Sequence, residues 1–393
     1  MDSYNYKENL NNVRSESNLT KFYIYELVSN LFFERAIFII YLATCGLSIL
    51  EITVFQSMIN ISMMVAEVPT GALADKIGKK YSLIIGNLFM IVYYILMMQS
   101  SSMVGFLIAA IFFGIGSTFI SGTNEAYLYD LMPEQKSSVK CLGRLSSIIT
   151  FSLGAAMILG GYIQEKGWQY VFVAGTIFQI LGIAMIAFLP NVIYLSNEKK
   201  TTLSTIYAQF KKDISLIKII IFLGFNVGVV SAVYILGQEI LASVDVSTNL
   251  VSILYFIDNI IAMLVFSQVE YISQKISVRK SIIIDIICMM LGFSLLLFKT
   301  PVAVSFAILL VSSTSNFLNT IFMDYFYNKI EDNIRATGGS VCNMISSLIM
   351  AIVFGIVGLF QNNYVLILVL LGLFSSLFLM VTFRKEIKNN FSK

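Results

Sequence analysis

The feature that most constrains this chain is a series of apolar stretches, each long enough to cross a lipid bilayer. About 20 apolar residues suffice for a helix to span the hydrocarbon core. Twelve such stretches follow one another, at residues 21–44, 50–72, 81–99, 103–128, 141–163, 168–190, 215–237, 249–271, 279–298, 302–326, 339–360 and 363–383. Charged residues make up only 12% of the chain, about half the ~25% that is typical of soluble domains. We therefore expect an all-α membrane protein with twelve transmembrane helices.

The basic residues predict which ends of these helices face the cytoplasm. If both termini are inside, all but three of the 26 lysines and arginines fall at the inner side. The exceptions are Lys166 and Lys299 in outer loops and Arg35 within the first predicted helix. Cytoplasmic loops of membrane proteins carry an excess of Lys and Arg. The charge pattern thus predicts a multi-pass protein with both termini cytoplasmic.

A polar stretch near the middle of the chain divides the predicted helices into two groups of six. We expect a cytoplasmic tail at 1–20, a first six-helix half at 21–190, a cytoplasmic linker at 191–214, a second half at 215–383 and a second tail at 384–393. Apolar residues within the linker recur at helical spacing, which is typical of an amphipathic helix on the inner leaflet. A plain linker is the simpler interpretation.

Weak internal repeats relate the two predicted halves. Ser346-Ser347 repeats Ser146-Ser147 two hundred residues later, and Lys275-Ile276-Ser277 falls 199 residues after Lys76-Ile77-Gly78. Two parallel repeats joined by a linker are known among transporters. We therefore expect two pseudo-symmetric halves.

Four predicted helices carry a one-sided stripe of polar residues at helical spacing. In lipid, an ionisable side chain costs about 2.5–3.5 kcal/mol at mid-depth, so it usually faces the bundle interior or a water-filled cavity. Hydrogen bonding between helices explains many Asn and Ser residues equally well. The stripes are Glu26, Asn30 and Glu34 in the first helix, Ser117, Ser121, Asn124 and Glu125 in the fourth, Asn226, Tyr234 and Gln238 in the seventh, and Ser312, Asn316, Asn319 and Thr320 in the tenth.

Carboxylates deep in the membrane are the candidates for proton exchange, because the chain contains no histidine. At ~1.5 Å per residue, Glu34 lies near the midplane, and Glu125 and Asp258 lie ~12–14 Å from the nearer surface. We expect Glu34 and Glu125 to exchange protons, with Asp258 as a third candidate. The alternative is a permanent ion pair of Arg35 with one of them.

A polar segment between the second and third apolar stretches predicts a tight cytoplasmic loop. It runs from Gly71 to Lys80, and its two glycines, Gly71 and Gly78, permit an abrupt turn. Six of its residues match the pattern G-x-L-x-D-x-x-G-[R/K]-[R/K], namely Gly71, Leu73, Asp75, Gly78, Lys79 and Lys80. The segment resembles the signature loop between helices 2 and 3 of the major facilitator superfamily.

This resemblance implies roles for the polar residues above. In that superfamily the first, fourth, seventh and tenth helices line a central substrate cavity, which implies a cavity set of Asn30, Glu34, Arg35, Ser121, Asn124, Asn226, Tyr234, Gln238, Asn316 and Asn319. The signature-loop residues latch the two halves on the inner side, with basic residues paired to acids near the end of helix 4. Three acids outside the loop, Glu67, Asp130 and Asp324, lie near the inner interface, and this depth also suits a gating role. The implied gating set is Gly71, Asp75, Gly78, Lys79, Lys80, Asp130, Glu67 and Asp324.

A second segment resembles bacterial efflux-type members of the same superfamily. The run from Ser121 to Asp130 is similar to an S-G-x-x-E-A-x-x-x-D pattern in those proteins. Two departures weaken that assignment: the fourth helix lacks the arginine of the proton-antiporter motif, and Met157 stands where the G-P-x-x-G-G motif has proline. The direction of transport therefore stays open at this point.

The predicted function is secondary active transport by alternating access. We see no nucleotide-binding loop, and the four cysteines stand singly with no metal-like spacing, so we expect no enzyme activity, cofactor or metal. Our first expectation is a monomer in a bacterial cell membrane that exports a hydrophobic drug or metabolite against protons. The alternatives are a symporter that imports a small polar or anionic nutrient, a lipid flippase, and a membrane sensor without transport. We expect no nucleic-acid partner.

Overall fold

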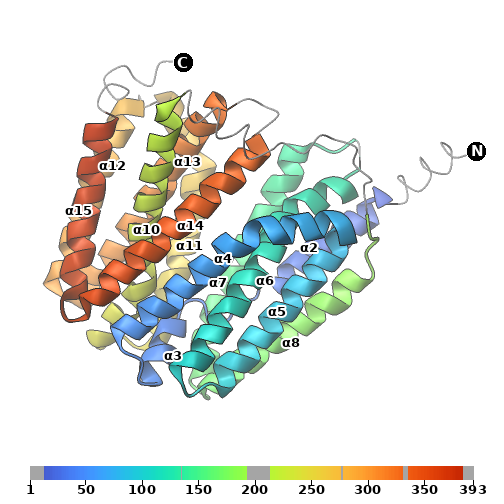
Figure 1. Cartoon of the computed structure of the whole chain (residues 1–393), viewed down its shortest axis with the longest axis horizontal. Helices are drawn as coiled ribbons and strands as arrows, with labels where there is room; N and C mark the ends of the chain where they lie inside the picture. The colour runs from blue at the N-terminus through green and yellow to red at the C-terminus, as the bar shows by residue number, and fades with distance from the viewer. Residues whose placement is uncertain (1–12, 134, 193–212, 276–277, 331–334, 384–393) are drawn as a thin grey trace, which may run out of the picture. The chain divides into compact units, whose positions relative to one another are not determined.

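The computed structural model describes residues 13–133, 135–192, 213–275, 278–330 and 335–383, and almost all of them lie in helices (Figure 1). Within these ranges, ten helices are long and apolar enough to cross a membrane, and a shorter apolar helix covers Ile282–Phe298. The predicted linker helix and most of both tails lie outside the described residues. The described helices are α2 (Glu16–Ser29), α3 (Phe38–Thr44), α4 (Ile49–Ile77), α5 (Lys79–Gln99), α6 (Met103–Leu131), α7 (Ser138–Gln164), α8 (Trp168–Ala187), α10 (Ile214–Ser243), α11 (Thr248–Lys275), α12 (Val278–Leu295) with the 3-10 turn η1 (Leu296–Phe298), α13 (Pro301–Lys329), α14 (Arg335–Leu359), the 3-10 turn η3 (Gln361–Asn363) and α15 (Tyr364–Thr382).

Polar N-cap side chains define the first residue of several helices, which the apolar composition does not locate by itself. The side chains of Ser15, Ser102 and Thr300 each accept a hydrogen bond from the backbone N–H three residues later, and Asp213 accepts from Ser215 N at 2.9 Å. Each cap satisfies one of the N–H groups that lack a partner in the first turn of a helix. Pro301 occupies the first helical position after Thr300, where its missing N–H costs nothing.

The chain divides into two compact units. The first unit comprises Met1–Ala36 and Val65–Glu198, and the second comprises Ile37–Met64 and Lys199–Lys393. Residues 37–64 therefore pack with the second unit, although they precede the linker in the sequence. Specific hydrogen bonds hold them there: Gln238 Oε1 accepts from Ile39 N at 3.0 Å, and the Ser57 hydroxyl donates to Ala351 O at 3.0 Å. The predicted halves at 21–190 and 215–383 remain a prediction.

In the first unit, α5 packs along α6 and α8, while α2 contacts α7 and α8 (Figure 1). Tyr25 and Tyr127 lie fully buried beside Phe22, with the Phe22 and Tyr127 rings edge to face at 5.3 Å. Glycine brings α5 and α6 close, because a Cβ at Gly86 would lie 3.2 Å from Gly116 O. This packing gives the unit a rigid frame.

In the second unit, α10 packs against α13, α14 and α15. Its core includes Phe222, whose ring centroid lies 4.9 Å from that of Phe322. Asn226 donates to the Ser315 hydroxyl and accepts from the Ser375 hydroxyl, each at 3.1 Å. A buried amide thus joins α10, α13 and α15 where lipid offers no alternative partner.

The first predicted span, 21–44, is interrupted in the structure. Helix α2 ends at Ser29, residues 30–37 are not helical, and α3 begins at Phe38. Within a membrane this requires other partners for the last carbonyls of α2. Asn30 N donates to Glu26 O at 3.2 Å, Leu31 N donates to Val28 O at 3.4 Å, and side chains satisfy the other two: Ser152 donates to Leu27 O, and Gln179 donates to Ser29 O at 2.8 Å.

Helix α7 approaches the interrupted segment through a glycine. A Cβ placed on Gly160 would lie only 1.8 Å from Phe33 O, which is a backbone atom and cannot move aside easily. Gly160 therefore serves close packing. The sequence did not indicate the partner, since residue 33 was predicted to be helical.

We predict that Gly160→Ala destabilises the protein by about 1–3 kcal/mol, because the added methyl group overlaps Phe33 O. The melting temperature of the purified protein in detergent measures the effect. Gly143→Ala is the matched control on the same helix, since a Cβ there meets nothing within 4 Å. Equal melting temperatures for the two variants would contradict the packing argument.

Candidate functional site

A cavity of about 390 Å³ lies within the first unit, between the interrupted segment and helices α5, α6 and α7. Its apolar walls include Phe32, Met90 and Phe113. Half of the lining residues are polar, a high share for a site among membrane-spanning helices. These polar residues are Asn30, Arg35, Ser117, Ser121, Asn124, Glu125 and Ser146.

Arg35 lies in the cavity wall because the helix is interrupted there. Its guanidinium carbon stands 4.9 Å from the centroid of the Phe113 ring, within the range of a cation–π contact. This contact holds the planar fork of donors on the α6 side of the cavity. A guanidinium so placed is suited to bind a carboxylate, a phosphate or a set of hydroxyl groups.

Glu26 organises the amides of the cavity, although it was not among the predicted site residues. Asn30 Nδ2 donates to Glu26 Oε2 at 2.9 Å, and Asn124 Nδ2 donates to the same oxygen at 3.2 Å. The Glu26 side chain is fully buried, and its Oε1 has no hydrogen-bond partner among the described residues. The sequence did contain a signal, since Glu26 begins the stripe that continues with Asn30.

The three predicted proton carriers have different surroundings. Glu34 is fully buried, does not line the cavity, and accepts a hydrogen bond from the Tyr94 hydroxyl at 3.1 Å. Glu125 is exposed and lines the cavity. Asp258 belongs to the second unit, where it is 4% exposed and accepts a hydrogen bond from the Ser312 hydroxyl. The structure thus brings Glu125 to the cavity, whereas Glu34 is next in sequence to the lining residue Arg35 and does not line the cavity itself.

The predicted cavity residues of the second unit make contacts between helices. Asn226 is bonded to two serines as described above, and Gln238 is fully buried against α3. The Tyr234 ring meets that of Tyr255 edge to face at 4.6 Å. Asn316 and Asn319 are half-buried on α13. The contacts of Asn226 and Gln238 favour the interpretation as hydrogen bonds that hold helices together.

The signature segment differs from the predicted loop in where the chain turns. Helix α4 continues through Pro69 and Gly71 to Ile77, and the turn consists of Gly78 alone, with φ 92° and ψ 151°. Only glycine adopts that backbone readily. A Cβ at Gly78 would also overlap the Asn191 side chain, whose Nδ2 donates to Ile77 O at 3.1 Å. A Cβ added at Gly71 would meet no atom within 4 Å, so no close contact requires a glycine there.

The two lysines after the turn bind the ends of neighbouring helices. Lys79 Nζ lies 2.7 Å from Asp130 Oδ2 and donates to Ala126 O at 3.0 Å, and Lys80 Nζ donates to Ala187 O at 2.6 Å. These contacts secure α5 to α6 and α8. Of the other predicted gating residues, Asp75 is exposed and Glu67 is half-buried. The side chain of Asp324 lies outside the described residues.

A polar cavity among membrane-spanning helices can bind a solute, as a membrane transporter must. The family model of the Major Facilitator Superfamily matches residues 28–354, which is more than half of the chain. The chain therefore belongs to this superfamily, as the signature segment suggested.

Solved structures share the fold at low sequence identity. A single-residue mutant of the nucleoside transporter NupG superposes with a TM-score of 0.80 at 15% identity, covering 95% of this chain and 100% of that one. A D-xylose–proton symporter superposes with a TM-score of 0.71 at 14% identity, and the match covers 91% of this chain and 96% of that one. These likenesses establish the fold and leave the solute open.

Among curated proteins, an uncharacterised MFS-type transporter of Methanocaldococcus jannaschii is 29% identical over 181 residues. The match covers 45% of this chain and 46% of that protein. The chain thus matches less than half the length of its curated relatives.

We predict that Lys79→Gln and Asp130→Asn each destabilise the protein by about 1.5–3 kcal/mol, because each leaves one charged partner uncompensated. Asp130 is only 5% exposed, so water cannot replace the lysine fully. Melting of the single and double variants in detergent forms a double-mutant cycle. The double variant should lose less than the sum of the single losses, and additive losses would exclude a direct interaction.

Proposed function

We propose that this protein is a proton-coupled symporter that imports a small polar solute across a bacterial cytoplasmic membrane. The observation that carries the proposal is the polar cavity around Arg35, with Asn30, Asn124 and Glu125 in its wall. Such a cavity offers donors on the guanidinium and the serine hydroxyls of the wall, and acceptors on the carboxylate. A solute rich in hydroxyl groups or bearing one anionic group suits this set.

The chemistry of the cavity favours import of a small polar solute by a symporter over export of a hydrophobic drug. An apolar ligand would cover the polar side chains of the wall without offering them a hydrogen bond, and each buried polar group left without a partner in this way costs about 1–3 kcal/mol. A polar solute that pairs with them avoids this cost. The two structural neighbours named for nucleoside and D-xylose transport support the same choice, since both names refer to hydroxyl-rich solutes.

Alternating access supplies the transport cycle in this proposal. The two six-helix halves expose the solute site to each side in turn, and the protein acts as a monomer with both termini cytoplasmic. The Lys79–Asp130 pair and the turn at Gly78 serve the cytoplasmic gate, where they stiffen the inner ends of α5 and α6. Asp75, Lys80 and Glu67 belong to the same gate.

Proton coupling is assigned to Glu34, next to the arginine of the cavity. Its carboxyl group is removed from solvent and contacts the Tyr94 hydroxyl. A carboxyl group so placed couples proton binding to transport if the outward-facing state exposes it to the outside and the inward-facing state exposes it to the cytoplasm. It then binds a proton on one side and releases it on the other. Glu125, which is exposed at the cavity, fits solute binding better, and Asp258 fits a bond between α11 and α13.

We predict that Arg35→Gln lowers solute uptake by about tenfold or more, because a charge-assisted hydrogen bond to the solute is lost. Proteoliposomes with an acidic exterior are tested with radiolabelled nucleosides, pentoses, inositol and monocarboxylates, and with one lipophilic cation. Lys166→Gln is the matched control, because Lys166 is an exposed cation of the same unit, away from the cavity. Gradient-driven movement of the lipophilic cation alone would overturn the proposal in favour of efflux.

We predict that Glu34→Gln abolishes accumulation against a gradient but preserves solute exchange between the two sides. Glutamine still accepts the Tyr94 hydrogen bond, so the fold is kept while the titratable group is removed. Uptake with and without a pH gradient, compared with counterflow exchange, separates the two activities. Glu125→Gln and Asp258→Asn are measured in parallel, and loss of coupling in either of them, with Glu34→Gln still coupled, would reassign the proton.

A further inference from the structure

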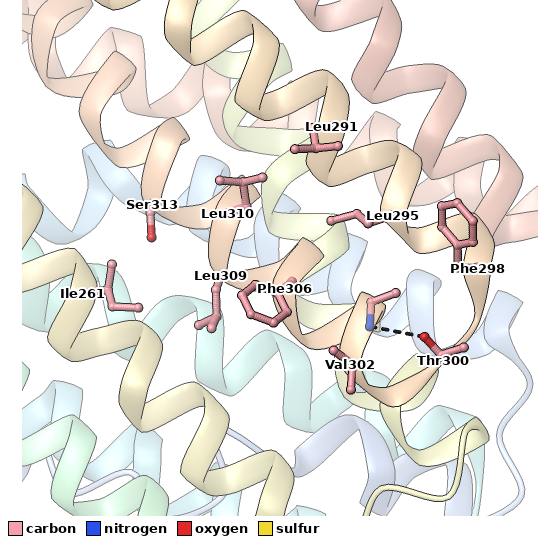
Figure 2. A pocket seen from close by; sticks show the side chains of 11 residues that line it. Ile261, Leu291, Leu295, Phe298, Thr300, Val302, Phe306, Leu309, Leu310 and Ser313 are labelled. Carbon is pink, nitrogen blue, oxygen red and sulfur yellow. Dashed lines mark hydrogen bonds between the residues drawn. The ribbon is translucent and has the colours of Figure 1, made fainter.

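The second unit contains an apolar groove of about 720 Å³ that the transport mechanism does not use. It runs between α11, α12 and α13 and ends at η1 and Thr300, as Figure 2 shows. Leu291, Phe298 and Phe306 are 54%, 68% and 61% exposed, so the groove lies on a surface that faces lipid in a membrane.

The groove wall offers almost nothing to a polar ligand. Thr300 and Ser313 are its only polar lining residues, and Thr300 Oγ1 already accepts a hydrogen bond from Ala303 N at 3.3 Å. Apolar walls that face an unfilled space lose dispersion contacts on one side. In a bilayer the space is therefore filled by hydrocarbon.

The length of the groove matches one leaflet of a bilayer. Its wall follows α13 from Val302 near the helix start to Ser313, which is ~16 Å at 1.5 Å per residue. Half of a hydrocarbon core is ~15 Å. In the predicted topology the end at Thr300 lies at the outer surface, so the groove extends from the outer interface to the midplane.

A cation stands at the outer end of the groove. Lys299 lies between the lining residues Phe298 and Thr300 and is exposed, with a left-handed backbone at φ 48°. Only two basic residues are predicted in the outer loops, so this placement runs against the usual charge asymmetry of membrane proteins. A lysine at the interface attracts the phosphate of an anionic lipid.

We propose that this groove is a binding site for one anionic phospholipid of the outer leaflet, with an acyl chain along α13 and the headgroup phosphate at Lys299. The apolar wall suits the acyl chain, and its length suits a chain that crosses one leaflet. The cation at the end of the groove suits the headgroup phosphate. The site is independent of the solute cavity, which lies in the first unit.

Tryptophan quenching by brominated lipids tests the site. The chain contains a single tryptophan, Trp168, so Trp168→Phe provides a background without a native reporter. Phe306→Trp then places the reporter in the groove wall. Phe374→Trp on α15 is the matched control, because Phe374 is a similarly exposed aromatic residue, 56% against 61%, and does not line the groove.

Both reporters are placed in phosphatidylcholine vesicles with rising fractions of brominated phosphatidylglycerol. The groove reporter should reach half-maximal quenching at a fraction about fivefold lower than the control, which is the preference that one interfacial cation supplies. Brominated phosphatidylcholine should quench the groove reporter and the control reporter at similar lipid fractions. Lys299→Gln should move the groove reporter's phosphatidylglycerol curve to the control curve.

Ala303→Phe supplies a second variant that narrows the groove without touching the charge. It should remove the excess quenching while Lys299 remains in place. Parallel curves for the two reporters with both lipids would show an ordinary lipid-facing surface and overturn the proposal. Stronger quenching by a brominated free fatty acid than by phosphatidylglycerol would also overturn it, in favour of an unesterified ligand. If Ala303→Phe does not fold, the Lys299→Gln comparison still decides.

Discussion

The structure depends on one constraint, which is that backbone polar groups inside a membrane have no water to bond. Long helices meet this constraint by themselves, and an interruption must be repaired by neighbours. At the end of α2 the repair is complete, since each of the last four carbonyls accepts a hydrogen bond from Asn30, Leu31, Ser152 or Gln179. Helices α7 and α8 are tied to the interruption through Ser152 and Gln179.

The interruption also creates the candidate site. A continuous helix would place Glu34 and Arg35 about 100° apart around one axis. Without helical geometry, Arg35 reaches the cavity wall beside Phe113, while Glu34 is buried against Tyr94. Neighbouring residues of opposite charge thus occupy different environments, and one position can serve the solute while the other serves the proton.

Sequence reasoning recovered the helices because their lengths are dictated by bilayer thickness, and the family because six residues of the signature segment match its pattern. It missed the interruption at residues 30–37, since Leu31, Phe32, Phe33 and Ile37 are as apolar as any helical segment. The partners that stabilise it, such as Gln179, lie 150 residues away. Glu26 was visible in a stripe, but burial and its two amide partners could be known only from the fold.

The turn between α4 and α5 has a consequence besides the gating role proposed for it. A single left-handed residue, Gly78, joins two long helices, and Asn191 closes over it. Proteases need several consecutive residues in extended form, and inserted segments are tolerated best at exposed loop tips. The junction of α4 and α5 offers neither an extended segment nor an exposed loop tip. An inserted epitope or a protease site would have to unwind part of a helix here, so this junction is a poor choice for an inserted label.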